Sequence, residues 1–137
     1  MPAGYSGTPL AKKLGIKEGA TILLYNQPDH YWDLFSDLPE SIKVLKNIRK
    51  DEVDFIHVFC KTTEELQKVI PRYKDALKKT GMLWVSWPKG SSKIPTDLKR
   101  DLIRIHILQS GLVDIKVAAI DDDWSGLKFV YRVSDRN

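Results

Sequence analysis

Short apolar runs alternate with longer helical stripes along the chain, and their order predicts the fold. Five runs are dense in β-branched and aromatic residues, which is typical of buried strands. They are residues 21–25, 53–60, 82–87, 112–120 and 127–133. Two stretches instead repeat apolar residues every three or four positions, which predicts amphipathic helices. The first stripe consists of Leu66, Val69, Ile70, Tyr73 and Leu77, and the second of Leu98, Leu102, Ile105 and Leu108.

Capping residues mark where these helices begin and end. Four residues have side chains that can cap the start of a helix: Thr8, Asp29, Thr62 and Thr96. Thr62 forms a capping box with Glu65, and we expect Gly15, Gly81 and Gly111 to end helices. Residues 8–16 and 29–36 are therefore predicted to form short helices. Residues 41–48 fit a strand or a helix, and we favour a short strand.

The alternation of strands and helices predicts an α/β fold over residues 1–137 as a single domain. Successive strands joined by helices pair in parallel through right-handed crossovers. Residues 121–126 are too short for a crossover, so the last two strands form a hairpin. We expect a small three-layer Rossmann-like sandwich, with a mainly parallel sheet and one antiparallel strand.

Charge and cysteine content narrow the class of protein. The 22 Lys and Arg exceed the 18 Asp and Glu, giving a net charge of +4, but the basic residues are spread along the chain. We interpret them as a solvated surface and expect no nucleic-acid partner. The single cysteine, Cys60, ends an apolar run, so we favour a buried thiol over a nucleophile. The sequence shows neither a signal peptide nor a membrane-spanning stretch, so a soluble, cytoplasmic protein without a membrane partner is expected.

Three motifs resemble a bacterial family of uncharacterised proteins that is classified only as a domain of unknown function. They are Gly-Tyr-Ser-Gly-Thr-Pro-Leu-x-x-Lys-Leu-Gly-Ile at residues 4–16, Leu-Trp-Val-Ser-Trp-Pro-Lys at 83–89, and Asp-Trp-Ser-Gly-Leu-Lys-Phe-Val-Tyr-Arg at 123–132. This resemblance implies a bacterial cytoplasmic protein and assigns no catalytic residue.

The order of elements also resembles S-adenosylmethionine-dependent methyltransferases. A leader helix, a first strand, later strands of the type Val-Asp-Phe-Ile and Gly-Met-Leu-Trp-Val, and a closing hairpin all correspond. Those enzymes need glycines after the first strand, where Asn26, Gln27 and Pro28 stand here. Lys46 and Asn47 stand where an acidic residue would hold the ribose. We therefore expect no methyl transfer and no cofactor.

Ligands of open parallel sheets bind beyond the carboxyl ends of the strands. Four loops should meet there and form a site for a small anionic molecule. Its candidate residues are Asn26, Gln27, Asp29, His30, Tyr31, Lys61, Trp87, Lys89, Ser91, Ser92, Asp123 and Trp124. Within this set, the stretch 87–93 combines glycine, serines and lysines, as anion sites do. Neighbouring aspartates at 121–123 point in different directions in a tight turn, so no metal site is expected.

Several functions remain open at this stage. We favour a non-catalytic domain that binds a small anion, and we assign no catalytic residue. One alternative is an interaction or self-association module with Trp32, Trp87 or Trp124 as exposed anchors. Another is an enzyme, either a degenerate methyltransferase-like one or one that uses His30 beside Asp29 as an acid or base.

Overall fold

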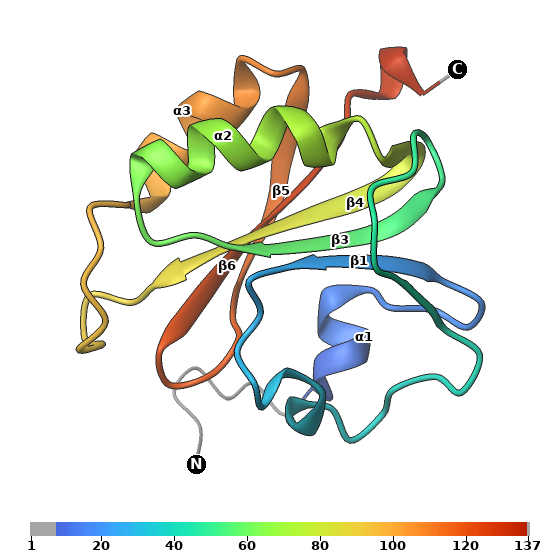
Figure 1. The fold of residues 1–137 in the computed structure, drawn as a ribbon, viewed down its shortest axis with the longest axis horizontal. Helices are drawn as coiled ribbons and strands as arrows, with labels where there is room; N and C mark the ends of the chain where they lie inside the picture. The colour runs from blue at the N-terminus through green and yellow to red at the C-terminus, as the bar shows by residue number, and fades with distance from the viewer. Residues whose placement is uncertain (1–7, 137) are drawn as a thin grey trace.

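The computed structural model describes residues 8–136 and contains one six-stranded sheet with helices on both faces (Figure 1). The strands are β1 (Thr21–Tyr25), β2 (Lys43–Leu45), β3 (Val53–Phe59), β4 (Leu77–Pro88), β5 (Leu112–Ala119) and β6 (Trp124–Tyr131). The helices are α1 (Leu10–Leu14), α2 (Thr63–Lys74) and α3 (Arg100–Leu108), with 3-10 turns η1 (Tyr31–Leu34) and η2 (Val133–Asp135).

The strands lie in the order β2-β1-β3-β4-β6-β5. Neighbours from β2 to β4 pair in parallel, whereas β6 runs antiparallel to both β4 and β5. This arrangement confirms the predicted Rossmann-like α/β sheet with a closing hairpin and one reversed strand. It also confirms the short strand within residues 41–48.

Two apolar cores separate the three layers. Leu66 and Ile70 of α2 and Ile103 of α3 pack against one face of the sheet. Leu14 of α1 and Tyr31 of η1 pack against the other. In Figure 1, α2 and α3 accordingly lie on the opposite side of the sheet from α1.

Two predicted boundaries of the long helices are wrong. Helix α2 ends at Lys74, and Leu77 and Gly81 belong to β4. A Cβ atom at Gly81 would lie 2.9 Å from the carbonyl oxygen of Val53, so glycine permits close strand pairing there instead of ending a helix. Thr96 does not cap α3: its hydroxyl donates to the carbonyl of Lys61 and accepts from the amide of Leu98.

The short helices also begin differently from the prediction. Pro9 and His30 occupy the positions before α1 and η1, and neither start has a side-chain cap, so Thr8 and Asp29 do not cap these helices. Gly15 does adopt the expected left-handed conformation after α1, with a φ of 92°. The capping box of α2 is confirmed, because Thr62 Oγ1 accepts from the amide of Glu65 over 3.1 Å.

Candidate functional site

The carboxyl ends of β1, β3, β4 and β5 lie at the same edge of the sheet, because these strands are parallel to one another. β6 begins at that edge. The four loops predicted to meet beyond the strands therefore do share one rim. Their side chains, however, divide into separate groups.

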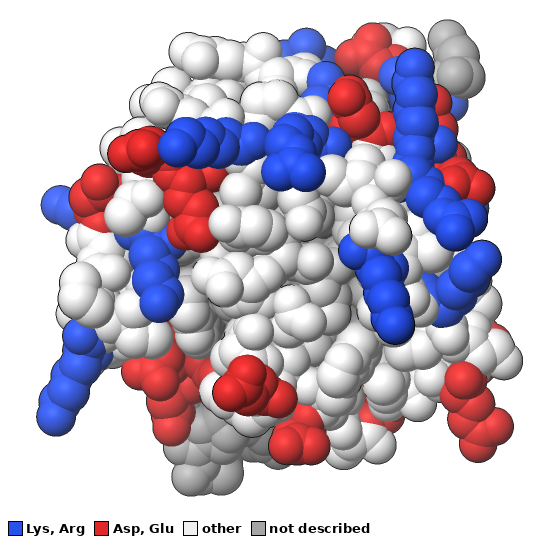
Figure 2. Space-filling model, viewed as in Figure 1, with Lys and Arg blue, Asp and Glu red and all other residues white. Residues whose placement is uncertain are grey.

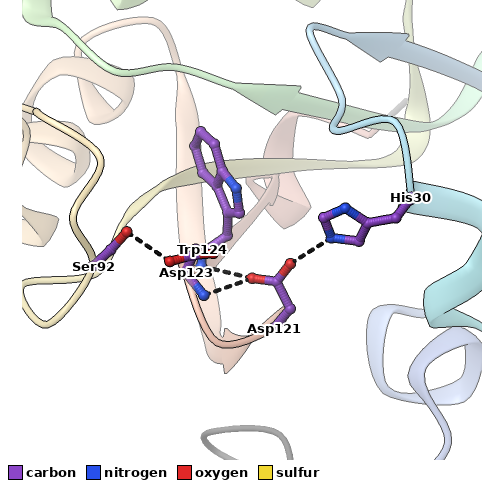
Figure 3. Close-up of polar contacts among 5 residues, drawn as sticks. All are labelled: His30, Ser92, Asp121, Asp123 and Trp124. Atoms are coloured by element: carbon purple, nitrogen blue, oxygen red, sulfur yellow. Dashed lines mark hydrogen bonds and ion pairs between the residues drawn. The ribbon is translucent and has the colours of Figure 1, made fainter.

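One group joins the first loop to the last (Figure 3). The Nε2 atom of His30 lies 2.9 Å from Oδ2 of Asp121, and 52% of the histidine side chain is exposed. The other oxygen of Asp121 accepts the backbone amides of Asp123 and Trp124 over 2.8 and 2.9 Å. Asp121 thus holds the tight turn between β5 and β6 and contacts His30 at the same time.

The third loop joins the same group. Ser92 Oγ donates to Oδ1 of Asp123 over 2.8 Å, and the amide of Lys89 donates to the carbonyl of Asp123 over 2.8 Å. Figure 3 shows these side chains directed at one another. The predicted residues His30, Ser92 and Asp123 are therefore brought together, but their hydrogen bonds mainly hold three loops to one another. We call this group of contacts the clasp.

The turn after β1 is closed by its own side chains. Asn26 takes the left-handed conformation, with a φ of 55°, and its side-chain amide donates to the carbonyl of Phe59 over 3.5 Å. Gln27 and Asp29 are exposed at the rim. Tyr31 was predicted to line the site, but the structure places it in the core with 1% exposed, because its ring packs edge-on against Phe59.

The hydroxyl of Tyr31 belongs to a buried chain of hydrogen bonds that links η1 to β3 and β4. This hydroxyl lies 2.9 Å from Nδ1 of His57, and Nε2 of His57 lies 2.7 Å from Oγ of Ser86. Burial lowers the pKa of His57 from 6.5 to about 3 and raises the pKa of Tyr31. The imidazole is therefore neutral at neutral pH and acts as a structural link between η1, β3 and β4.

The second loop faces a different part of the rim. Lys61 donates its amide to Oε1 of Glu65, whose Oε2 accepts the hydroxyl of Tyr25 over 2.8 Å. These three residues line a hollow of about 500 Å³ beside the start of α2. The same region holds Cys60, whose thiol is buried as expected. Burial, followed by the nearby Glu65 carboxylate, raises the pKa of that thiol to about 12.

A larger cavity of about 750 Å³ opens between the β4–α3 loop, the start of α3 and β5. Trp87, Lys89 and Ser92 line it, whereas Ser91 is exposed outside it. Sequence reasoning missed Lys99 and Arg100, which line the same cavity. The available signal was a pair of basic residues between Leu98 and Leu102, at the start of the predicted helical stripe.

Two of the three predicted tryptophan anchors are not exposed. Trp87 is 8% and Trp124 is 6% exposed, and Trp124 packs edge-on against Phe59 at 5.0 Å between ring centroids. Trp32 is half-buried and packs against Tyr31. Of the three proposed anchors, Trp32 alone therefore keeps partial exposure, and the interaction hypothesis stays a prediction.

Two features are absent from the part of the chain that the structure describes: a metal-type cluster of side chains and a membrane-spanning helix. Within residues 8–136, no three His, Cys, Asp or Glu side chains gather as a metal site would require. None of the helices in that range combines the length and apolar character needed to cross a membrane.

Solved structures with a similar fold are methyltransferases. A SAM-dependent methyltransferase from Aquifex aeolicus aligns with a TM-score of 0.64 and 15% identity, over 88% of this chain and 86% of that one. A TehB-like SAM-dependent methyltransferase from Corynebacterium glutamicum aligns with a TM-score of 0.57 and 10% identity, over 90% and 86%. No family model and no curated protein matches the chain.

At these identities the likeness shows the fold alone, and it confirms the methyltransferase-like order of elements predicted from the sequence. The likeness gives no support to the non-catalytic interpretation, and it carries no function over to this chain. The resemblance to an uncharacterised bacterial family stays a prediction. Its opening motif lies partly outside the described residues, since it begins at residue 4.

Proposed function

We propose that this protein is a degenerate methyltransferase-fold domain that binds a small organic anion in the cavity between β4, α3 and β5. The observation that carries the proposal is the lining of that cavity, which combines the basic residues Lys99 and Arg100 with the apolar residues Leu98 and Val117. Its volume of about 750 Å³ is in the range of small-molecule sites. Such a space suits a ligand with a charged group and an apolar body.

Two basic side chains of this lining, Lys99 and Arg100, are available to a ligand. The hydroxyl of Ser92 is already engaged with Asp123. Lys99 is exposed, and Arg100 lies 3.8 Å from the exposed carboxylate of Asp101, a distance at which the pair is weak. The amides of the first turn of α3 have no side-chain cap and add partial positive charge. A phosphate or carboxylate placed between these groups would gain charge-assisted hydrogen bonds.

The turn after β1 argues against methyl transfer by this protein. Backbone can approach a cofactor closely only where side chains are small, and the turn after β1 carries Asn26, Gln27 and Pro28. The side chain of Asn26 is directed at the carbonyl of Phe59 in β3. A degenerate methyltransferase-like enzyme remains the second candidate, since the similar solved structures are methyltransferases.

Isothermal titration with three probes tests the proposal: AMP, uncharged adenosine and S-adenosylhomocysteine. We expect AMP to bind, adenosine to bind at least tenfold more weakly, and the double variant K99Q/R100Q to lose AMP binding by at least tenfold. The matched control is K43Q/K46Q, which removes the same charge from exposed positions at the β2 edge. AMP binding that both variants retain would contradict the proposal. S-adenosylhomocysteine binding that K99Q/R100Q leaves unchanged would favour the methyltransferase-like candidate.

A further inference from the structure

Four lysines that are far apart in the sequence gather on the α1 face of the β5–β6 hairpin. Lys13 belongs to α1 and Lys17 follows it, while Lys116 and Lys128 stand directly opposite each other on β5 and β6. The ammonium of Lys116 donates to the carbonyl of Lys13 over 2.8 Å, and that of Lys13 donates to the carbonyl of Ala119 over 3.0 Å. We call these four residues the lysine cluster.

The Lys128 ammonium sits close to the end of α1, 3.3 Å from where a Cβ atom of Gly15 would lie. Within residues 8–136, no hydrogen bond or ion pair engages this ammonium group. Burial lowers the pKa of Lys128, and the charges of Lys116 and Lys17 lower it further. The groups that shift it are therefore cations, with no carboxylate among them.

The same holds for Lys13. Burial lowers its pKa first, and then the charges of Lys116 and Lys89. The charged groups that shift it are therefore again cations. Figure 2, by contrast, shows a face of the molecule on which basic and acidic side chains are interspersed.

This arrangement costs stability in the isolated protein. Like charges directly opposite each other on neighbouring strands repel each other and destabilise the pair. The two carbonyls that accept from Lys13 and Lys116 offset part of this cost. An ammonium group has three donors, so these lysines keep further donors for a ligand. An anionic partner would relieve the repulsion and use those donors.

We propose that the lysine cluster binds the phosphodiester backbone of a nucleic acid. A backbone presents a row of single negative charges, and side chains on neighbouring strands are about 5 Å apart, which suits a row of contacts. The surface is formed by lysines and offers no set of base-reading side chains, so binding is independent of sequence. The sequence-based expectation of no nucleic-acid partner assumed scattered basic residues, whereas the fold assembles them.

This site is independent of the proposed anion cavity. The lysine cluster lies on the face of the sheet that α1 covers, whereas the cavity is lined by residues of α3 on the other face. The variant K99Q/R100Q should therefore keep nucleic-acid binding. Failure of either proposal leaves the other standing.

Fluorescence anisotropy with a labelled oligonucleotide tests the inference, using a single strand of about 20 nucleotides and the matching duplex in about 50 to 300 mM salt. Each phosphate contact to a single strand multiplies the binding constant by the salt concentration (in M) to the power of about −0.7. K116Q/K128Q should therefore bind about 25-fold more weakly at about 0.1 M salt, with a salt slope smaller by about 1.4. K43Q/K46Q, which removes the same net charge, should stay within about threefold of the wild type.

Circular dichroism and thermal melting establish that K116Q/K128Q is folded, which we expect because the substitution removes repulsion. If it does not fold, the exposed Lys17 serves instead, and K17Q should weaken binding about fivefold. Absence of wild-type binding to both the single strand and the duplex at the lowest salt would overturn the inference. An equal loss in K43Q/K46Q would overturn it too, since it would show general attraction by net charge.

Discussion

The buried histidine gives the most direct physical test of the structure. His57 is fully buried between Tyr31 and Ser86, and burial lowers its pKa from 6.5 to about 3. In the unfolded chain the same side chain takes up a proton below about pH 6.5. Between these two values the unfolded state binds one proton more than the folded state, so stability is lost as the pH falls.

The size of this effect follows from the two pKa values. One pKa unit corresponds to 1.36 kcal/mol, and the window between pH 7 and pH 4 covers most of the gap between 6.5 and about 3. The free energy of unfolding should therefore fall by about 3 kcal/mol through His57 alone over that window. Protonation would also make both ring nitrogens donors, which alters the hydrogen bonds to Tyr31 and Ser86.

Urea unfolding followed by tryptophan fluorescence at pH 7 and pH 4 measures this loss. Carboxylates contribute to the pH dependence of every variant, so the quantity of interest is the difference between the wild type and His57→Gln. The variant should be less stable at pH 7 by about 1–3 kcal/mol, because it disturbs a buried network, but it should lose about 3 kcal/mol less on acidification. His106→Gln, on the half-buried position of α3, should follow the wild type. Equal acid losses in the wild type and His57→Gln would refute the buried, neutral histidine.

Two further predictions rest on local geometry. Gly81→Ala should lower the free energy of unfolding by about 1–3 kcal/mol, since its Cβ would lie 2.9 Å from a carbonyl oxygen of β3. The control is Gly90→Ala, whose Cβ would have nothing within 4 Å and whose stability should be within about 0.5 kcal/mol of the wild type. Thermal melting compares the two variants. Asp121→Asn should cost about 1 kcal/mol in urea unfolding, because it weakens acceptance of two turn amides and the contact with His30; an unchanged midpoint would mean that the clasp adds no stability.

The sequence predicted the order of strands and helices from residue 53 onward, because apolar runs alternate there with helical stripes. The boundary between α2 and β4 escaped prediction for a specific reason. Leu77 continues the helical spacing from Ile70 and Tyr73, and the true turn at Asp75 and Ala76 contains neither glycine nor proline. Periodicity alone cannot separate the end of a helix from the first residue of a buried strand.

The candidate sites depended on information that no local pattern holds. The rim loops were predictable, because parallel strands must bring their carboxyl ends together. The direction of each side chain was not predictable from the sequence. Tyr31 was therefore assigned to the site, although it packs in the core. The lysine cluster depends on the register that sets Lys116 opposite Lys128 and on the placement of Lys13 above them. The contact between Lys116 and Lys13 joins residues 103 positions apart.

The closed first turn explains why both proposed binding surfaces involve the β5–β6 hairpin. A ligand that entered beneath the end of β1 would have to displace Tyr31 and leave His57 without one of its two buried partners. Each unsatisfied buried group costs about 1–3 kcal/mol, in addition to the packing of the tyrosine ring. At the hairpin, by contrast, the exposed Lys116 keeps donors available. Binding there disrupts no core contact, so it does not carry the free-energy cost of opening the core beneath the end of β1.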